Sequence, residues 1–129
     1  MIAYNRHNSP LMIKSQAFSV RITNMVEFLL RNRSQNMRPL YNQVLRSGTS
    51  IMANISESQF TQSGADFITK LHIALKEANE TQNWITLLHE QKCLTQKECE
   101  SMTKDCNEII AMLVSSLNTS KRNQQQVVK

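Results

Sequence analysis

The chain has 129 residues with a net charge of +5, and hydrophobic residues make up 40% of it. A chain of this length is expected to fold as one domain with a core of its own. Only two glycines and two prolines occur, which excludes a hairpin-rich β protein, because such a protein needs these turn residues. The longest apolar run, from Ile109 to Val114, is far shorter than the roughly 20 residues that cross a bilayer, so we expect no membrane partner.

Cysteine and charge usage indicate a compartment and a class of ligand. The three cysteines are odd in number and favour a reducing compartment, and Met1–Pro10 lacks the apolar segment of an export signal, so we expect a cytoplasmic protein. The residues before Ala65 include seven basic and two acidic side chains, whereas those from Ala65 onward include eight of each. Six of those seven are arginines, whose guanidinium binds phosphate, which predicts a nucleic-acid surface; a solvated basic surface is the alternative.

A loose polar arm is expected over residues 1–14. Ser15 is the expected N-cap of a first helix over residues 15–32, and a polar turn follows at residues 33–36. Apolar residues recur in this helix at the spacing of one helical face, which predicts its buried side. These residues are Phe18, Ile22, Met25, Val26 and Leu29.

The second helix is expected over residues 37–60, with Pro39 in its first turn, where the missing N–H does no harm. Gly48 lies mid-helix at a cost of about 1 kcal/mol relative to alanine, which indicates the close approach of a neighbouring helix. This helix carries an apolar and a polar stripe. The apolar stripe is Leu40, Val44, Gly48, Ile51 and Ile55, and the polar stripe is Gln43, Arg46, Ser50, Asn54 and Glu57.

The third helix is expected over residues 64–91, with Ser63 as its N-cap. The fourth is expected over residues 95–118, where Thr95 and Glu98 have the spacing of a capping box. Both helices carry an apolar face at helical spacing. The inward residues are Phe67, Leu71, Ala74, Leu75, Ala78, Thr81, Ile85 and Leu88 on the third helix and Cys99, Met102, Cys106, Ile109, Ile110, Leu113 and Leu117 on the fourth.

Residues 118–129 have the composition of a frayed tail. Short connections force neighbouring helices to run antiparallel, so the predicted fold is an all-α, up-down-up-down antiparallel four-helix bundle over residues 15–117. Further apolar residues of the second and third helices lie outside the core arcs, which favours a self-association interface over a simple exposed patch or a wider core. These residues are Tyr41, Leu45, Met52, Ile73 and Trp84.

The polar stripe of the second helix predicts a network with the third. Arg46 is expected to meet Glu77 or Glu80 across the two helices. A partly buried pair of this kind specifies register more than it adds stability. The other candidate members of the network are Gln43, Ser50, Asn54 and Glu57.

Two stretches of these helices carry a family resemblance. The first is Gln43-Val44-Leu45-Arg46-Ser47-Gly48-Thr49-Ser50-Ile51, then Ala53-Asn54-Ile55 and Glu57, and the second is Ala65-Asp66-Phe67-Ile68 and Ile73-Ala74-Leu75-Lys76-Glu77-Ala78-Asn79-Glu80-Thr81. They closely resemble the 23S rRNA intervening-sequence proteins of bacteria, and the resemblance covers about Phe18 to Leu117. It implies a four-helix bundle that assembles as a homo-oligomer, with a pentameric ring as the expected form. It also implies kinship with the accessory variability determinant of diversity-generating retroelements, which binds nucleic acid and a reverse transcriptase.

No residue set has the pattern of catalytic or metal-binding machinery, so we expect no enzyme activity, cofactor or metal. A di-metal bundle needs a Glu-x-x-His pair on each of two helices, and the glutamates of the third helix have no histidine at that spacing. His89, Cys93, Cys99 and Cys106 imitate a zinc site, but their spacing is not of the Cys-x2-Cys type. A Cys93–His89 nucleophile lacks an orienting third residue.

The sequence therefore predicts a non-enzymatic homo-oligomer that binds RNA or DNA by neutralising phosphates. Base reading is not expected, since aromatic residues make up only 5% of the chain and no stacking platform is evident. A structural scaffold or adaptor that binds a protein partner is the alternative, and the salt dependence of binding distinguishes the two. The candidate nucleic-acid-binding residues are Arg21, Arg31, Arg33, Arg38 and Arg46.

Overall fold

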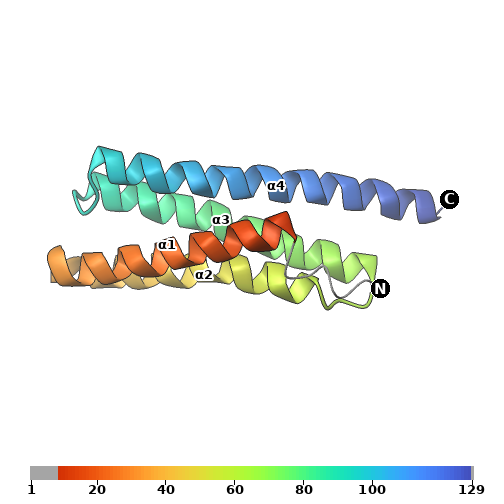
Figure 1. Ribbon diagram of the computed structural model, residues 1–129, viewed down its shortest axis with the longest axis horizontal. Helices are drawn as coiled ribbons and strands as arrows, with labels where there is room; N and C mark the ends of the chain where they lie inside the picture. The colour runs from red at the N-terminus through yellow and green to blue at the C-terminus, as the bar shows by residue number, and fades with distance from the viewer. Residues whose placement is uncertain (1–8, 129) are drawn as a thin grey trace.

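The computed structural model describes residues 9–128. Four antiparallel α-helices run up-down-up-down over this range and are joined by short turns, as Figure 1 shows. The described residues contain no strand, so the predicted all-α four-helix bundle is confirmed. The elements are α1 (Pro10–Asn32), the short 3-10 helix η2 (Gln35–Met37), α2 (Arg38–Ser58), α3 (Gly64–Glu90) and α4 (Gln96–Val128).

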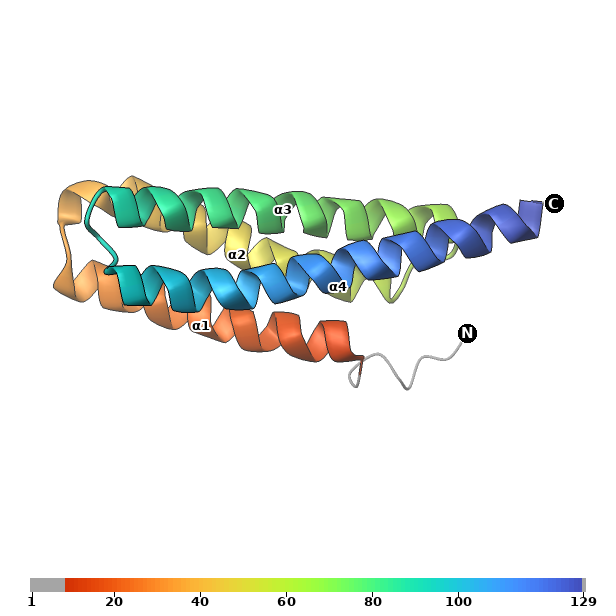
Figure 2. The same cartoon turned by 90° about the horizontal axis from the view of Figure 1, so that it is seen from above.

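Each helix packs against its neighbours in the chain, and α1 and α4 close the bundle. The α2–α3 contact is the most extensive and the α1–α4 contact the smallest of the four. In Figure 2, α1 and α4 lie side by side near the α1–α2 and α3–α4 turns and then diverge. All four helices supply core residues, and the largest fully buried side chains are Phe18, Ile22, Leu29, Tyr41, Val44, Ile51, Ile55, Leu71, Ile85, Leu88, Ile109 and Leu113.

The predicted start signals of α3 and α4 are confirmed. At α3, the Asp66 N–H donates to Ser63 Oγ (3.1 Å). At α4 the bonds are reciprocal: the Glu98 N–H donates to Thr95 Oγ1 (3.1 Å), and the Thr95 N–H donates to Glu98 Oε1 (2.8 Å). A capping box satisfies backbone donors that the first turn of a helix leaves free, so it fixes where α4 begins.

The start of α1 differs from the expectation, because Ser9 and not Ser15 is the N-cap. The Met12 N–H donates to Ser9 Oγ (3.2 Å), and Pro10 occupies the first turn, where no N–H is needed. Ser15 lies buried inside the helix and donates to the Met12 carbonyl (3.0 Å). The first turn buries Leu11 and Met12, so the core extends further toward the N-terminus than the expected arm allowed.

The end of α4 also differs, because the helix continues to Val128 instead of fraying after residue 118. No glycine or proline follows Leu117 to stop it, and the lysine, arginine and glutamines of this segment favour helix. Residues 1–8 of the expected arm, which include Arg6, and residue 129 of the expected tail lie outside the described residues. Every helix within residues 9–128 is too short or too polar to cross a membrane.

Gly48 marks a close approach of two helices, as the sequence predicts. A Cβ atom at this position would lie 2.9 Å from both Cγ1 and Cγ2 of Ile22 on α1, nearer than carbon atoms ordinarily approach. Ile22 is itself fully buried. The absence of a side chain at Gly48 therefore sets the separation of α1 and α2 at the middle of the bundle.

Candidate nucleic-acid interface and inter-helix polar network

The predicted ion pair between α2 and α3 is present. Arg46 donates through Nη1 to Glu77 Oε2 (3.3 Å) and through Nη2 to Glu80 Oε2. Its Nε donates to Gln43 Oε1 on the same helix (3.2 Å). The arginine side chain is 48% exposed and that of Glu77 only 16%, so the pair lies at the rim of the α2–α3 contact. One guanidinium thus joins three side chains across two helices.

Sequence reasoning missed two further side-chain contacts at the α2–α3 interface, which we call the seam. Trp84 Nε1 donates to Glu80 Oε2 (3.2 Å), so the tryptophan belongs to the same network. Beneath it, Thr81 Oγ1 donates to Ser47 Oγ (2.9 Å) within the core. The spacing of four residues between Glu80 and Trp84 was the available signal, because such residues are neighbours on a helix surface.

Three predicted members do not join this network, which corrects the expectation for Ser50, Asn54 and Glu57. Ser50 Oγ donates to the Arg46 carbonyl (2.7 Å), and Asn54 Nδ2 donates to the Ser50 carbonyl (2.9 Å). Glu57 pairs with Lys70 of α3 (2.8 Å). Short polar side chains readily bond the carbonyl four residues earlier, so the stripe divides into local bonds and a separate ion pair.

Replacing Arg46 with methionine should lower the free energy of unfolding by about 1 kcal/mol, because Glu77 would stay largely buried without its cation. Urea denaturation followed by circular dichroism measures this loss. The matched control is Arg31→Met, since Arg31 is 75% exposed in its pair with Glu27. That change should stay within about 0.5 kcal/mol of the parent. Equal effects of both variants would contradict a specific role for the seam.

The expected self-association residues do not form an exposed set. Tyr41 is the clearest correction, since it is fully buried. Its hydroxyl donates to the Ser34 carbonyl (2.8 Å) and contacts Cys93 Sγ (3.7 Å), so the buried polar group is satisfied by a turn carbonyl. Burial raises the pKa of Tyr41 to about 12, with a further contribution from Cys93. Among the others, Leu45, Met52 and Trp84 pack partly buried against the core, and Ile73 is exposed.

The five candidate arginines do not gather on one surface, which corrects the single-surface prediction. Arg21 and Arg33 reach toward α4, where they pair with Asp105 (2.6 Å) and Glu98 (3.4 Å). Arg46 points to α3, on another side of the bundle. The remaining pairs are Arg31 with Glu27 (2.8 Å) and Arg38 with Gln35 Oε1 (2.6 Å). Carboxylates on the α3–α4 half thus pair with three of the five candidate arginines, which are Arg21, Arg33 and Arg46.

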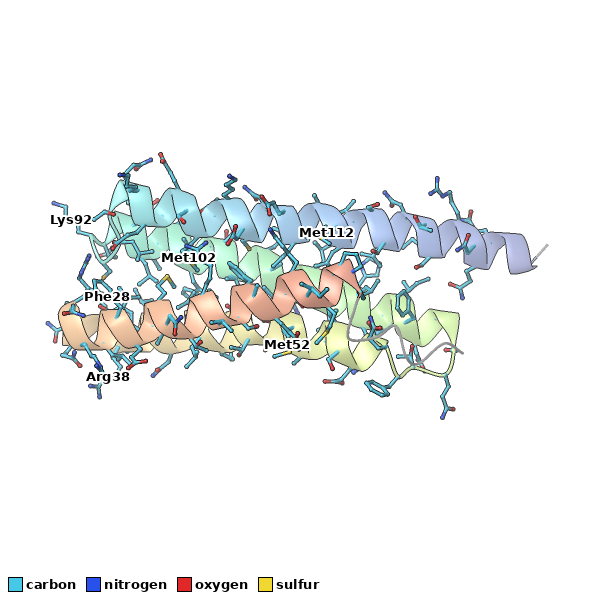
Figure 3. The ribbon with its side chains drawn as sticks, in the orientation of Figure 1. Phe28, Arg38, Met52, Lys92, Met102 and Met112 are labelled. Atoms are coloured by element: carbon cyan, nitrogen blue, oxygen red, sulfur yellow. The ribbon has the colours of Figure 1, made fainter. Side chains whose placement is uncertain are left out.

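The tertiary structure gathers a different set of cations where two turns meet. We define the turn end as residues 31–38 and 91–97, which lie at the same end of the bundle (Figure 3). These segments contain five cations and no acidic residue: Arg31, Arg33, Arg38, Lys92 and Lys97. Among the described residues, Arg38, Lys92 and Lys97 have no carboxylate partner.

Sequence reasoning missed Lys92 and Lys97. Lys92 follows α3 with a φ of 63°, the left-handed conformation that reverses the chain after a helix. The two lysines lie about 60 positions from the arginine-rich turn, and sequence periodicity relates only residues within one element, so it could not predict that they lie together. Only the antiparallel arrangement of the four helices brings the two turns together.

A groove of about 640 Å³ lies between α1 and α4 beside the turn end. Its lining includes Phe28, which is 41% exposed, and the apolar side chains of Met25, Leu94 and Met102. The Arg33 guanidinium lies over the Phe28 ring, 5.0 Å from its centroid. Figure 3 shows Phe28 near the turn end and Met102 further along the bundle.

The cysteines occupy structural positions. Cys93 and Cys106 are buried and Cys99 is partly buried, and all three are free thiols. Cys106 Sγ donates to the Ala78 carbonyl (3.3 Å), and burial raises the pKa of this thiol to about 12. In the described part of the chain, no three His, Cys, Asp or Glu residues group closely enough to hold a metal ion.

These features define an all-α four-helix-bundle protein in which side-chain pairs join α1 to α4 and α2 to α3. The family model described as 23S rRNA-intervening sequence protein matches residues 9–115, and the chain belongs to this family. The chain is also similar to a crystal structure from Bacteroides thetaiotaomicron, described as a protein with unknown function from the S23 ribosomal protein family. The two are 47% identical with a TM-score of 0.79, and the match covers 83% of this chain and 97% of the other. No curated protein matches the chain.

Proposed function

We propose that this chain is a non-enzymatic, homo-oligomeric, cytoplasmic protein that binds RNA or DNA through the turn end. The observation that carries the proposal is the charge of the two turns, which hold five cations and no carboxylate. Three of these cations have no carboxylate partner among the described residues, so phosphates would meet them without breaking an ion pair. The five cations are Arg31, Arg33, Arg38, Lys92 and Lys97.

The composition around these cations supports phosphate binding. Serine, threonine, asparagine and glutamine occupy many other positions of the turn end and can donate hydrogen bonds to phosphate oxygens. The family description names 23S rRNA, and the crystallised relative is described as a member of a ribosomal protein family, which favours RNA among the nucleic acids. Kinship with the accessory variability determinant of diversity-generating retroelements would point to the same class of ligand.

Self-association would increase the number of phosphate contacts that one assembly makes through its turn ends. Ile13 and Val20 are 52% and 58% exposed, and their spacing of seven residues places them on one outer face of α1. We propose that such faces bring copies together, with a pentameric ring as the expected form, and that repeated turn ends convert weak phosphate contacts into avidity. A light-scattering mass equal to one chain at high protein concentration would contradict this part of the proposal.

The test of nucleic-acid binding is a triple variant, Arg38→Gln, Lys92→Gln and Lys97→Gln. Its affinity for a fluorescent RNA hairpin, measured by anisotropy, should fall about ten-fold or more, because three phosphate contacts are lost. The slope of log affinity against log salt should become shallower by about 2 for the same reason. The matched control is Lys76→Gln, Lys104→Gln and Lys121→Gln, which removes the same charge away from the turn end.

A protein-binding scaffold is the second candidate function. A hollow on α3 beside Trp84 and Leu87 is bordered by Glu80 and Glu90, which suits an apolar and basic segment of a partner protein. Equal affinity of the triple variant and its control for RNA, with little response to salt, would remove the nucleic-acid proposal and favour this scaffold.

A further inference from the structure

We infer that the groove between α1 and α4 receives an unpaired nucleobase of bound RNA, with Phe28 as its stacking surface. The inference rests on the proposed nucleic-acid binding and specifies the ligand as a strand with unpaired bases rather than a continuous duplex. Base stacking had not been expected from so few aromatic residues, but one exposed ring beside several cations is sufficient for it.

The shape of the groove suits a flat, partly apolar group. Its volume of about 640 Å³ lies within the range of about 300 to 1,000 Å³ that is usual for ligand pockets. Met25, Leu94 and Met102 provide apolar lining, and Phe28, which is 41% exposed, lines the groove as well. A base inserted into the groove would cover apolar surface that water now contacts, which favours its entry.

The Phe28 ring is held in place before any ligand arrives. The Arg33 guanidinium lies 5.0 Å from the ring centroid. Arg33 is itself fixed by hydrogen bonds to the Cys93 carbonyl (2.8 Å) and to Glu98 Oε2 (3.4 Å). A pre-ordered aromatic side chain loses little conformational freedom on binding, so more of the stacking energy appears as affinity.

Charge identifies the occupant. Arg21, Lys97 and Glu98 line the same groove. Arg21 pairs with Asp105 and Glu98 pairs with Arg33, so Lys97 of the turn end is the lining cation that has no carboxylate partner among the described residues. The amide of Asn24 and the hydroxyls of Thr95 and Ser101 can form hydrogen bonds with base edges. An aromatic ring attached to an anionic backbone is the chemistry that matches a partly apolar groove with the uncompensated Lys97 at its border, and a nucleotide combines both.

The test compares Phe28→Ala with Phe60→Ala, an equivalent truncation of a phenylalanine that is 59% exposed in the α2–α3 turn at the opposite end. Anisotropy is measured with a single-stranded RNA and with a fully paired RNA duplex carrying the same number of phosphates. Phe28→Ala should weaken single-strand binding by about five- to hundred-fold, the usual loss for removing one base–aromatic stack. Its duplex binding and its salt slope should match the parent, and Phe28→Trp should retain single-strand affinity.

Each other outcome has a definite meaning. Equal single-strand affinities of Phe28→Ala and Phe60→Ala would overturn the inference while leaving phosphate binding at the turn end intact. A reduced oligomer mass of Phe28→Ala, with unchanged RNA affinity per chain, would overturn it in favour of a second copy of the chain as the occupant. Failure of the unaltered protein to bind either RNA would overturn the proposed function together with the inference.

Discussion

Replacing Gly48 with alanine is expected to destabilise the protein by about 1 to 3 kcal/mol, although alanine is the better helix former. The new Cβ would lie 2.9 Å from two γ carbons of Ile22, and Ile22 is fully buried and branched at its own Cβ. The isoleucine cannot rotate away cheaply, so α1 and α2 must separate. Urea denaturation at neutral pH measures the loss, and increased stability of Gly48→Ala would show that the helices adjust without strain.

Two companion variants isolate the cause. A Cβ added at Gly64 would meet no neighbouring atom within 4 Å, so Gly64→Ala should raise stability by about 0.4 to 1 kcal/mol by restricting the unfolded chain. Ile22→Ala removes all three side-chain carbons that the new methyl group would meet at Gly48. Ile22→Ala should therefore cost less beside Gly48→Ala than alone, with a coupling of about 1 kcal/mol or more. If the destabilising effects of Gly48→Ala and Ile22→Ala simply add, the strain does not arise from contact between these two side chains.

Stability should fall steeply in alkali, and Cys106 is the main cause. Burial raises the pKa of its thiol from 9.0 to about 12. The unfolded chain therefore loses this proton first as the pH rises, which favours unfolding between pH 9 and about 12. The slope is about 1.4 kcal/mol per pH unit, so the protein should lose about 2 to 3 kcal/mol between pH 9 and pH 11. Tyr41 adds to the loss between pH 10 and about 12.

Cys106→Ala tests this assignment. The variant should be less stable than the parent at neutral pH, because it loses the hydrogen bond to the Ala78 carbonyl, but its stability should fall less between pH 9 and pH 11. Cys99→Ala is the matched control, since it removes a partly buried thiol from the same helix and leaves Cys106 in place. A parallel alkaline loss in the parent and Cys106→Ala would assign the effect to other groups.

Local patterns were sufficient for most of the fold. Ser63 and the pair of Thr95 and Glu98 predicted the starts of two helices, because capping acts within three residues. The same reasoning placed the α1 cap at Ser15 and overlooked Ser9 before Pro10, so the wrong one of two similar signals was chosen. The end of α4 was misplaced because a polar composition was taken for fraying, although no residue there stops a helix.

The candidate site was only partly predictable. Arg46 and Glu77 were paired correctly because both lie on stripes that face a neighbouring helix, and α2 and α3 are adjacent in the chain. Tyr41 was placed on the surface because it lies outside the core arc of its helix, and helical periodicity does not show that its hydroxyl donates to the Ser34 carbonyl. The carboxylates on α4 that pair with Arg21 and Arg33 are 84 and 65 positions away in the chain, so these two ion pairs could not be predicted from local sequence patterns.

The sequence by itself therefore determined the helical class, the core stripes, the inter-helix arginine pair and the glycine contact, since each depends on periodicity or on chemistry within a few residues. Only the tertiary structure decided which charges remain uncompensated, that two distant turns combine at one end, and that Phe28 opens onto a groove between α1 and α4. Those features depend on the lengths and rotations of all four helices, which no local pattern specifies.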